Sequence, residues 1–228
     1  MKADNTDFFW PSYTDLMTSL FFIMLVLYVL TYIRLNSTIK LQKEKLAIIE
    51  AVEENLKPLK TETSLFRYEE QYKRFTLAFD VNFKISEYEM QSGKLDNYSS
   101  ASVNISIAGK KLQKVIDNLA QQKQTNPALK NVSYLVIVSG YASHLLNGNE
   151  LDDYLLSYKR AYFLRQYWKR NGIDFEDNKY KDLIDLQVSG NGWGGIGRFT
   201  RDSTNYFLNE TKNQRFIIQV VPKIGDIK

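Results

Sequence analysis

Asp15 is a carboxylate in a segment that holds no other charge. It is the one charged side chain between Phe8 and Ile33, and the run from Leu16 to Ile33 is entirely uncharged. About 18 residues of this kind are the lower limit for a helix that spans a membrane. An ionisable group inside such a helix is costly, and by default it is functional, because it can exchange a proton or hold a cation. Movement of an ion across a membrane is therefore the first hypothesis.

A helix over this segment would place polar side chains beside Asp15. Thr18 and Ser19 follow at i+3 and i+4, and Phe22 follows at i+7, so all three share its face. The opposite face is apolar and suits lipid or a partner helix: Leu16, Phe21, Ile23 and Leu27. Pro11 suits the first turn, where its missing N–H costs nothing. We expect Asp15 to face a protein interior or a water-filled crevice, with hydroxyls from Thr18 and Ser19 nearby.

The composition excludes several functional classes. The 228 residues include no cysteine, which rules out disulfides, thiol catalysis and thiolate metal sites. The formal net charge is +4, without a run of Lys and Arg, so we expect no nucleic-acid partner. A cleaved signal peptide is not expected. The apolar run is longer than the h-region of a signal peptide, about 7–15 residues, and it has no small-x-small cleavage motif.

No catalytic arrangement is evident in the sequence. The single histidine, His144, follows Ser143 directly, and adjacent residues seldom form a nucleophile–base pair. The Gly-rich segment 191–197 has no Gly-Lys-Ser/Thr ending of a phosphate loop. We expect a protein that is not an enzyme, with no bound metal and no cofactor.

Residues 34–70 are expected to form a helical stalk or linker. Apolar residues recur there at three- and four-residue spacings: Leu35, Ile39, Leu46, Ile49, Val52, Leu56 and Leu59. This seam predicts either a short coiled coil in a dimer stalk or an amphipathic helix packed on its own domain. Pro58 marks the expected end of the helix.

The rest of the chain alternates strand and helix patterns. Strands are predicted over 75–83, 132–138, 186–188 and 216–221, and helices over 105–119 and 151–168, the second closed by Asn171-Gly172. Gly140, two residues after the strand pattern over 132–138, marks the expected end of that strand. The order βαβαββ predicts an α+β sandwich, with helices on one face of a small mixed sheet.

The segment around Asp15 resembles a known family. Trp10 followed by Tyr13-x-Asp15-Leu16-Met17-Thr18-x-Leu20 resembles the membrane helix of MotB-type stator subunits of bacterial rotary motors. The resemblance implies that Asp15 carries the ion, with Thr18 and Ser19, and that Tyr13 and Phe22 face the pore or the partner. The transported ion would be H⁺ or Na⁺, and H⁺ is favoured because one carboxylate and two hydroxyls make a poor Na⁺ site.

The second half of the chain resembles an OmpA-like peptidoglycan-binding domain over about residues 75 to 222. The elements that resemble it are 136–140, Leu156-Ser157-x-x-Arg160-Ala161, Gly172-Ile173, Gly190-x-Gly192 and 213–215. The resemblance implies peptidoglycan binding by Arg160, Asp153, Leu156 and Asn82, with Arg160 on a peptide carboxylate. The usual Gly-His-Thr-Asp is Gly140-Tyr141-Ala142-Ser143 here, so the ligand-binding aspartate of that motif is missing.

Together the two resemblances describe a MotB-like chain, most similar to ZorB of the Zorya antiphage defence system. That family implies a homodimer surrounded by five copies of a MotA-like (ZorA-like) membrane partner. The alternatives are a flagellar MotB-type stator subunit and a passive OmpA-like wall tether without ion transport. The expected parts are a cytoplasmic tail over 1–10, a transmembrane helix over 11–33, the stalk over 34–70 and the binding domain over 71–228.

The expected location is the bacterial inner membrane, with a single pass, a cytoplasmic N-terminus and a periplasmic C-terminal domain. Basic residues after the apolar run favour the opposite orientation by the positive-inside rule: Arg34, Lys40, Lys43 and Lys45. The resemblance decides for the periplasm, because a peptidoglycan-binding domain is useful only there.

Overall fold

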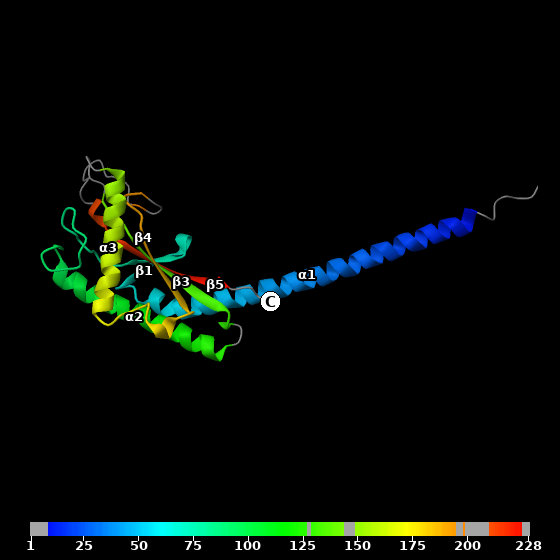
Figure 1. Cartoon of the computed structure of the whole chain (residues 1–228), viewed down its shortest axis with the longest axis horizontal. Helices are drawn as coiled ribbons and strands as arrows, with labels where there is room; N and C mark the ends of the chain where they lie inside the picture. The colour runs from blue at the N-terminus through cyan, green and yellow to red at the C-terminus, as the bar shows by residue number, and fades with distance from the viewer. Residues whose placement is uncertain (1–8, 127–128, 144–148, 195–197, 199–209, 225–228) are drawn as a thin grey trace, which may run out of the picture. The chain divides into compact units, whose positions relative to one another are not determined.

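The computed structural model describes residues 9–126, 129–143, 149–194, 198 and 210–224. Most of the expected tail, His144 and the end of the Gly-rich segment 191–197 lie outside these ranges. The chain divides into two compact units, Met1–Ala47 and Ile48–Lys228. Figure 1 shows the elements of both units.

The first unit consists of the larger part of helix α1 (Phe9–Thr61). Residues 12–57 contain neither glycine nor proline, so nothing in this stretch interrupts the helix. Among the described residues, α1 is the one helix long and apolar enough to cross a membrane, with a mean hydropathy of 2.3 over its most apolar stretch. The uncharged run from Leu16 to Ile33 is roughly 27 Å long at 1.5 Å per residue, close to the thickness of a hydrocarbon core.

The last turns of α1 belong to the second unit. Ile48, Val52, Leu56 and Leu59 are buried in its hydrophobic core, whereas Leu35, Ile39, Leu46 and Ile49 are exposed in the single chain. Of the two interpretations of the apolar seam, packing on its own domain therefore holds for the final turns. The core begins at Ile48, earlier than the boundary at residue 71 taken from the sequence, because periodicity alone does not tell which surface a seam will meet.

The sheet of the second unit has five strands in the order β1-β2-β5-β3-β4. They are β1 (Phe66–Glu69), β2 (Arg74–Leu77), β3 (Val132–Gly140), β4 (Ile184–Gly190) and β5 (Phe216–Ile224). The β3–β4 pair is parallel, and the other pairs are antiparallel. The expected mixed sheet is confirmed.

Two details of the sheet differ from the prediction. Strand β1 was not predicted, and the strand expected over 75–83 ends at Leu77. Beyond Leu77 the chain forms a loop in which Val81 and Phe83 are buried, and Phe83 makes an isolated bridge to Leu95. A loop that inserts alternate side chains into the core has the same sequence pattern as a strand, which explains the difference.

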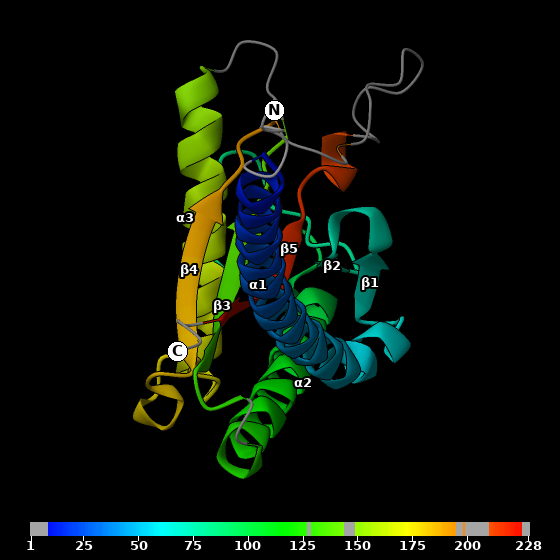
Figure 2. The same cartoon turned by 90° about the vertical axis from the view of Figure 1, so that its right-hand side faces the viewer.

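The second unit also contains the helices α2 (Tyr98–Thr125) and α3 (Glu150–Arg170). Two short 3₁₀ turns are η1 (Glu70–Tyr72) and η3 (Asn178–Tyr180). At the start of α3 the Asn149 side chain accepts a hydrogen bond from Leu151 N, and acidic residues follow in the first turn. The helix ends as predicted at Asn171 and Gly172, where Gly172 has a φ of 77°. Figure 2 shows α3 running alongside β3 and β4, on which it packs.

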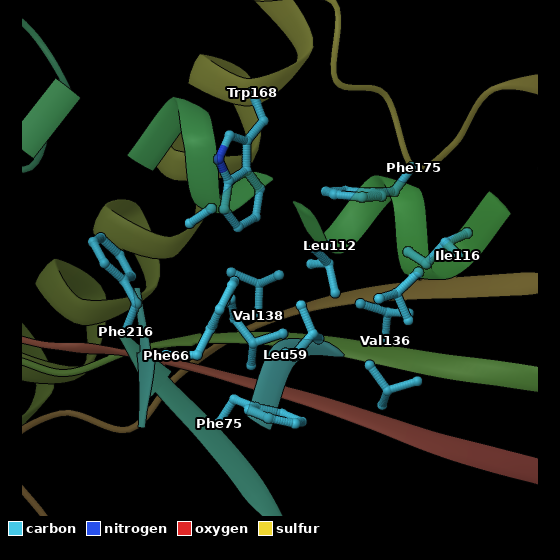
Figure 3. Packing of buried hydrophobic residues seen from close by; sticks show 14 of the residues in the cluster. Leu59, Phe66, Phe75, Leu112, Ile116, Val136, Val138, Trp168, Phe175 and Phe216 are labelled. Carbon is cyan, nitrogen blue, oxygen red and sulfur yellow. The ribbon is translucent and has the colours of Figure 1, made fainter. Parts of the chain in front are cut away.

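The core lies between the helices and the sheet (Figure 3). Residues of α1, β1, β2, α2, β3, α3 and β5 meet there, among them Leu59, Phe66, Phe75, Leu112, Val136, Trp168 and Phe216. The Trp168 Nε1 donates to the Ile105 carbonyl oxygen at 2.9 Å, which links α3 to α2. A Cβ on Gly109 would lie 2.5 Å from that nitrogen, so glycine permits this contact.

Tyr134 on β3 gives a stability prediction. Its side chain is fully buried, and its hydroxyl has no hydrogen-bond partner among the described residues. Burial raises the pKa of Tyr134. An unsatisfied buried polar group costs about 1–3 kcal/mol, so we expect Tyr134→Phe to raise the thermal midpoint by a few degrees.

Thermal melting followed by circular dichroism checks this expectation. Tyr180→Phe is the matched control, because the Tyr180 hydroxyl donates to Asp117 Oδ1 at 2.6 Å and its loss should lower the midpoint. A Tyr134→Phe variant less stable than the wild type would contradict the prediction.

Candidate functional site

The first candidate site is the face of α1 that carries Asp15. The helix places Asp15, Thr18, Ser19 and Phe22 along one side, as the spacing predicts, and all four are exposed in the single chain. The Thr18 hydroxyl donates to the Thr14 carbonyl oxygen at 2.7 Å. Its proton is therefore used within the helix, and its oxygen faces outward as an acceptor. Such an oxygen can receive a hydrogen bond from a protonated carboxyl or contact a cation.

A shallow hollow of about 370 Å³ lies on the neighbouring side of the helix. It is lined by Tyr13, Thr14, Met17, Thr18 and Phe21. Thr18 thus lies at the border between the hollow and the Asp15 face. Tyr13, predicted to face the partner, lines the hollow, whereas Phe22 lies with Asp15. The two predicted partner-facing residues therefore point to different sides of α1.

Aromatic residues occur near both ends of the uncharged run. Tyr13 precedes it, and Tyr28 and Tyr32 stack near its far end with ring centroids 6.5 Å apart. Tyrosine is enriched at membrane–water interfaces. Tyr13 and Tyr32 are separated by roughly 28 Å at 1.5 Å per residue, close to the thickness of the hydrocarbon core. On this scale Asp15 is only about 3 Å along the helix from Tyr13, at one end of the apolar segment.

The second candidate site is the surrounding of Arg160 on α3. The Arg160 side chain is only 2% exposed. Its Nε donates to the Glu87 carbonyl oxygen at 3.1 Å, and its Nη1 donates to the Tyr141 carbonyl oxygen at 3.3 Å. The guanidinium lies over the Phe83 ring, 4.4 Å from its centroid. Burial lowers the pKa of Arg160 to about 10, and the nearby charge of Asp153 opposes this shift. Arg160 is therefore a desolvated cation held by main-chain oxygens of its own domain.

The structure brings only some of the predicted wall-binding residues together. Asp153 is buried on α3, two turns before Arg160, and the two charges interact. Leu156 is half-buried on the same helix. Asn82 lies in the loop after β2, where its N–H donates to Asn97 Oδ1 at 3.0 Å. The neighbour of Asn82, Phe83, is the residue that contacts the guanidinium.

Tyr141 takes the place of the histidine in the family motif, and it joins a cluster of charged residues. It is 3% exposed, its hydroxyl lies 3.5 Å from Arg74 Nη1, and the Arg215 guanidinium lies over its ring at 5.2 Å. Glu69 pairs with Arg74 at 2.6 Å and with Arg215 at 3.5 Å. Sequence reasoning missed this cluster, because its members lie on β1, on β2, directly after β3 and directly before β5, and share no local motif.

Ser157 lies where α3 approaches the ends of β3 and β4, an approach that two glycines permit. Its hydroxyl donates to the Tyr154 carbonyl oxygen at 2.8 Å and accepts from Gly192 N at 2.8 Å. Gly140 and Gly190 are paired across the two strands, and a Cβ on either would collide with Ser157. The Leu156-Ser157-x-x-Arg160-Ala161 element therefore fixes the helix on the sheet as well as placing Arg160.

Within the described ranges, no group of three or more His, Asp or Glu side chains could hold a metal ion. His144 lies outside those ranges. The residues around Arg160 provide a buried cation and main-chain oxygens.

Neither a protein-family model nor a curated protein matches the sequence. Solved structures similar to this chain include the periplasmic domain of Helicobacter pylori MotB, with 16% identity, covering 72% of this chain and 90% of that one, at a TM-score of 0.35. A putative MotB-like protein from Desulfovibrio vulgaris has 13% identity over 80% of this chain and 98% of its own, at a TM-score of 0.43. The peptidoglycan-associated lipoprotein from Burkholderia pseudomallei has 14% identity, covering 62% of this chain and 88% of its own, at a TM-score of 0.34.

Proposed function

We propose that this chain is the B subunit of an ion-driven rotary motor in a bacterial inner membrane. The observation that carries the proposal is the position of Asp15. It is the one carboxylate in the apolar part of α1, which is the one described helix able to cross a membrane, and it shares a face with Thr18 and Ser19. An ionisable residue in such a helix faces a partner or a water-filled path and marks an ion pathway.

In the proposed cycle Asp15 alternates between a charged and a neutral form. Removal from water favours the neutral form, whereas water and neighbouring hydroxyls favour the anion. One elementary charge that crosses the membrane potential releases about 2.3 kcal/mol per 100 mV. This work would turn a ring of MotA-like partners, five to two copies of this chain, about the paired α1 helices. The transported ion is proposed to be H⁺.

Homodimerisation is proposed to use the exposed part of α1. Leu35, Ile39, Leu46 and Ile49 are exposed in the single chain at spacings compatible with helix pairing. Leu35, Ile39 and Leu46 follow the proposed membrane span and precede the second unit, and Ile49 lies at its start. A pair of chains could therefore associate through them without disturbing the folded domain.

The C-terminal unit is proposed to anchor the motor to peptidoglycan in the periplasm, so that the ring has a fixed reference. Arg160 is the proposed carboxylate contact. Its Nε bond to the Glu87 carbonyl oxygen is the one that a ligand carboxylate would replace. Such an exchange requires the Glu87 segment to move, while the charge of Asp153 continues to stabilise the cation.

Peptidoglycan sedimentation tests this anchoring role. With purified sacculi and the full chain in detergent, we expect Arg160→Ala to reduce the bound fraction at least tenfold. Arg165→Ala is the matched control, because Arg165 is on the same helix and pairs with Glu176 away from the pocket. Equal binding by wild type and Arg160→Ala, or no binding by either, would refute the pocket. Thermal melts of each variant establish that the proteins compared are folded.

The system served by the motor is proposed to be Zorya antiphage defence. The proposal is based on the short stalk and on the divergent 140–143 segment. A flagellar stator is the alternative within the same mechanism. A passive wall tether is the alternative without ion transport, and the fate of an Asp15 variant separates it from a motor. Protease treatment of spheroplasts tests the orientation: digestion of the C-terminal unit supports the periplasm, and protection contradicts it.

A further inference from the structure

A polar cavity of about 240 Å³ lies in the second unit, formed by β1, β2, the loop after β2 and the residues before β5. It is lined by Arg67, Thr76, Leu77, Ala78, Phe79, Asp80, Lys212, Gln214 and Arg215. Three of these side chains are cationic and one is anionic. Thr76 and Gln214 add uncharged hydrogen-bonding groups. The lining is thus rich in donors and has an excess of positive charge.

The sheet register explains why these residues meet. Arg67 is the register partner of Thr76 across β1 and β2, and Thr76 is the partner of Ile217 across β2 and β5. Register partners share a sheet face, and so do residues two apart along a strand. Arg215, two residues before Ile217, therefore lies on the same face as Arg67 and Thr76. The strand order therefore brings Arg67, Thr76 and the residues before β5 together, and the loop after β2 completes the cavity.

Arg215 is held in place before any ligand arrives. Its Nη1 lies 3.5 Å from Glu69 Oε1, and its guanidinium lies over the Tyr141 ring at 5.2 Å. Burial lowers the pKa of Arg215, and the charge of Glu69 opposes that shift. Glu69 also pairs with Arg74 at 2.6 Å. A guanidinium fixed in this way loses little freedom when it binds an anion, which favours affinity.

We propose that this cavity binds an oxyanion, either a carboxylate or a phosphate group, between Arg67, Lys212 and Arg215. Arg67 and Lys212 are exposed residues of the lining, while Arg215 supplies the fixed contact. Planar and tetrahedral oxyanions both accept hydrogen bonds from a guanidinium fork. The site does not use Arg160. If the ligand is a carboxylate of the wall peptide, the proposal rests on the proposed anchoring function; a free phosphate would bind independently of it.

Calorimetric titration of the full chain in detergent tests the site. The probes are inorganic phosphate, a soluble wall stem peptide with free carboxylates, and the same peptide with its carboxylates amidated. We expect wild type to bind phosphate or the free peptide and to bind the amidated peptide at least tenfold more weakly. Arg67→Gln combined with Lys212→Gln should weaken binding about tenfold or more, because two charged hydrogen bonds are lost. Arg215 is left intact because it supports the fold.

The matched control is Lys110→Gln combined with Lys114→Gln, two exposed lysines of α2 with the same change in net charge. It should bind like the wild type. Equal weakening in both double variants would overturn the site, since net charge alone would then explain the effect. A wild type that binds neither phosphate nor the free peptide would overturn it as well.

Sacculus sedimentation identifies the source of the anion. Loss of both probe and sacculus binding in the Arg67/Lys212 double variant supports a wall carboxylate. Loss of phosphate binding with unchanged sacculus binding supports a free phosphate. A wild type that sediments with sacculi but binds neither phosphate nor the free peptide removes the cavity site and leaves the anchoring function standing. A wild type that binds phosphate but not sacculi supports the cavity site and removes the anchoring function.

Discussion

Asp15→Asn is expected to reduce ion-driven activity to background while leaving the amount of protein, its assembly and its wall binding unchanged. Asparagine has nearly the shape of aspartate, but it can neither release a proton nor carry a negative charge. Each ion that crosses the membrane supplies about 2.3 kcal/mol per 100 mV only if a group in the path takes it up and releases it. Without that group, the work available per cycle is zero.

The measurement is proton flux in vesicles that contain this chain and the proposed MotA-like partner, together with a phage-protection assay. Ser37→Ala is the matched control, because Ser37 lies on α1 beyond the apolar run. Its hydroxyl donates a hydrogen bond to the Ile33 carbonyl oxygen of the same helix. That variant should behave as wild type. Asp15→Glu keeps the carboxyl group one methylene further out and should retain partial flux. Full phage protection by Asp15→Asn would exclude the motor and favour the passive tether.

Gly140→Ala is expected to lower the free energy of unfolding of the C-terminal unit by about 3 kcal/mol or more. A Cβ at this position would overlap the Ser157 carbonyl oxygen of α3, an atom that belongs to the helix backbone. A flexible side chain could rotate away, but a main-chain oxygen can move only with its helix. The same helix carries Arg160, so its displacement should also disturb the Nη1 contact to the Tyr141 carbonyl oxygen.

Thermal melting checks this expectation, with a fall of roughly 6–12 °C in the midpoint for a unit of this size. Gly194→Ala is the matched control: its nearest neighbour, the Tyr154 hydroxyl, would lie 3.7 Å from the new Cβ, an ordinary contact. Its midpoint should stay close to that of the wild type. A Gly140→Ala midpoint that also stays close would show that α3 is not held against β3 as described.

Much of the secondary structure could be predicted from the sequence because its signals are local. Alternating burial over β3 and the Asn171-Gly172 ending of α3 arise from side chains a few positions apart. Strand β1 could not be predicted. It is a four-residue strand, and what makes it a strand is its pairing with β2.

The same distinction applies to the candidate sites. The sequence by itself determined the face that Asp15 shares with Thr18 and Ser19, because helical periodicity fixes which side chains share one face. Only the tertiary structure decided that Arg160 is buried against the Glu87 and Tyr141 carbonyl oxygens. It also decided that Arg215 joins Arg67 around a cavity. These contacts join segments far apart in the chain, and their partners depend on strand order and helix packing, which no local pattern encodes.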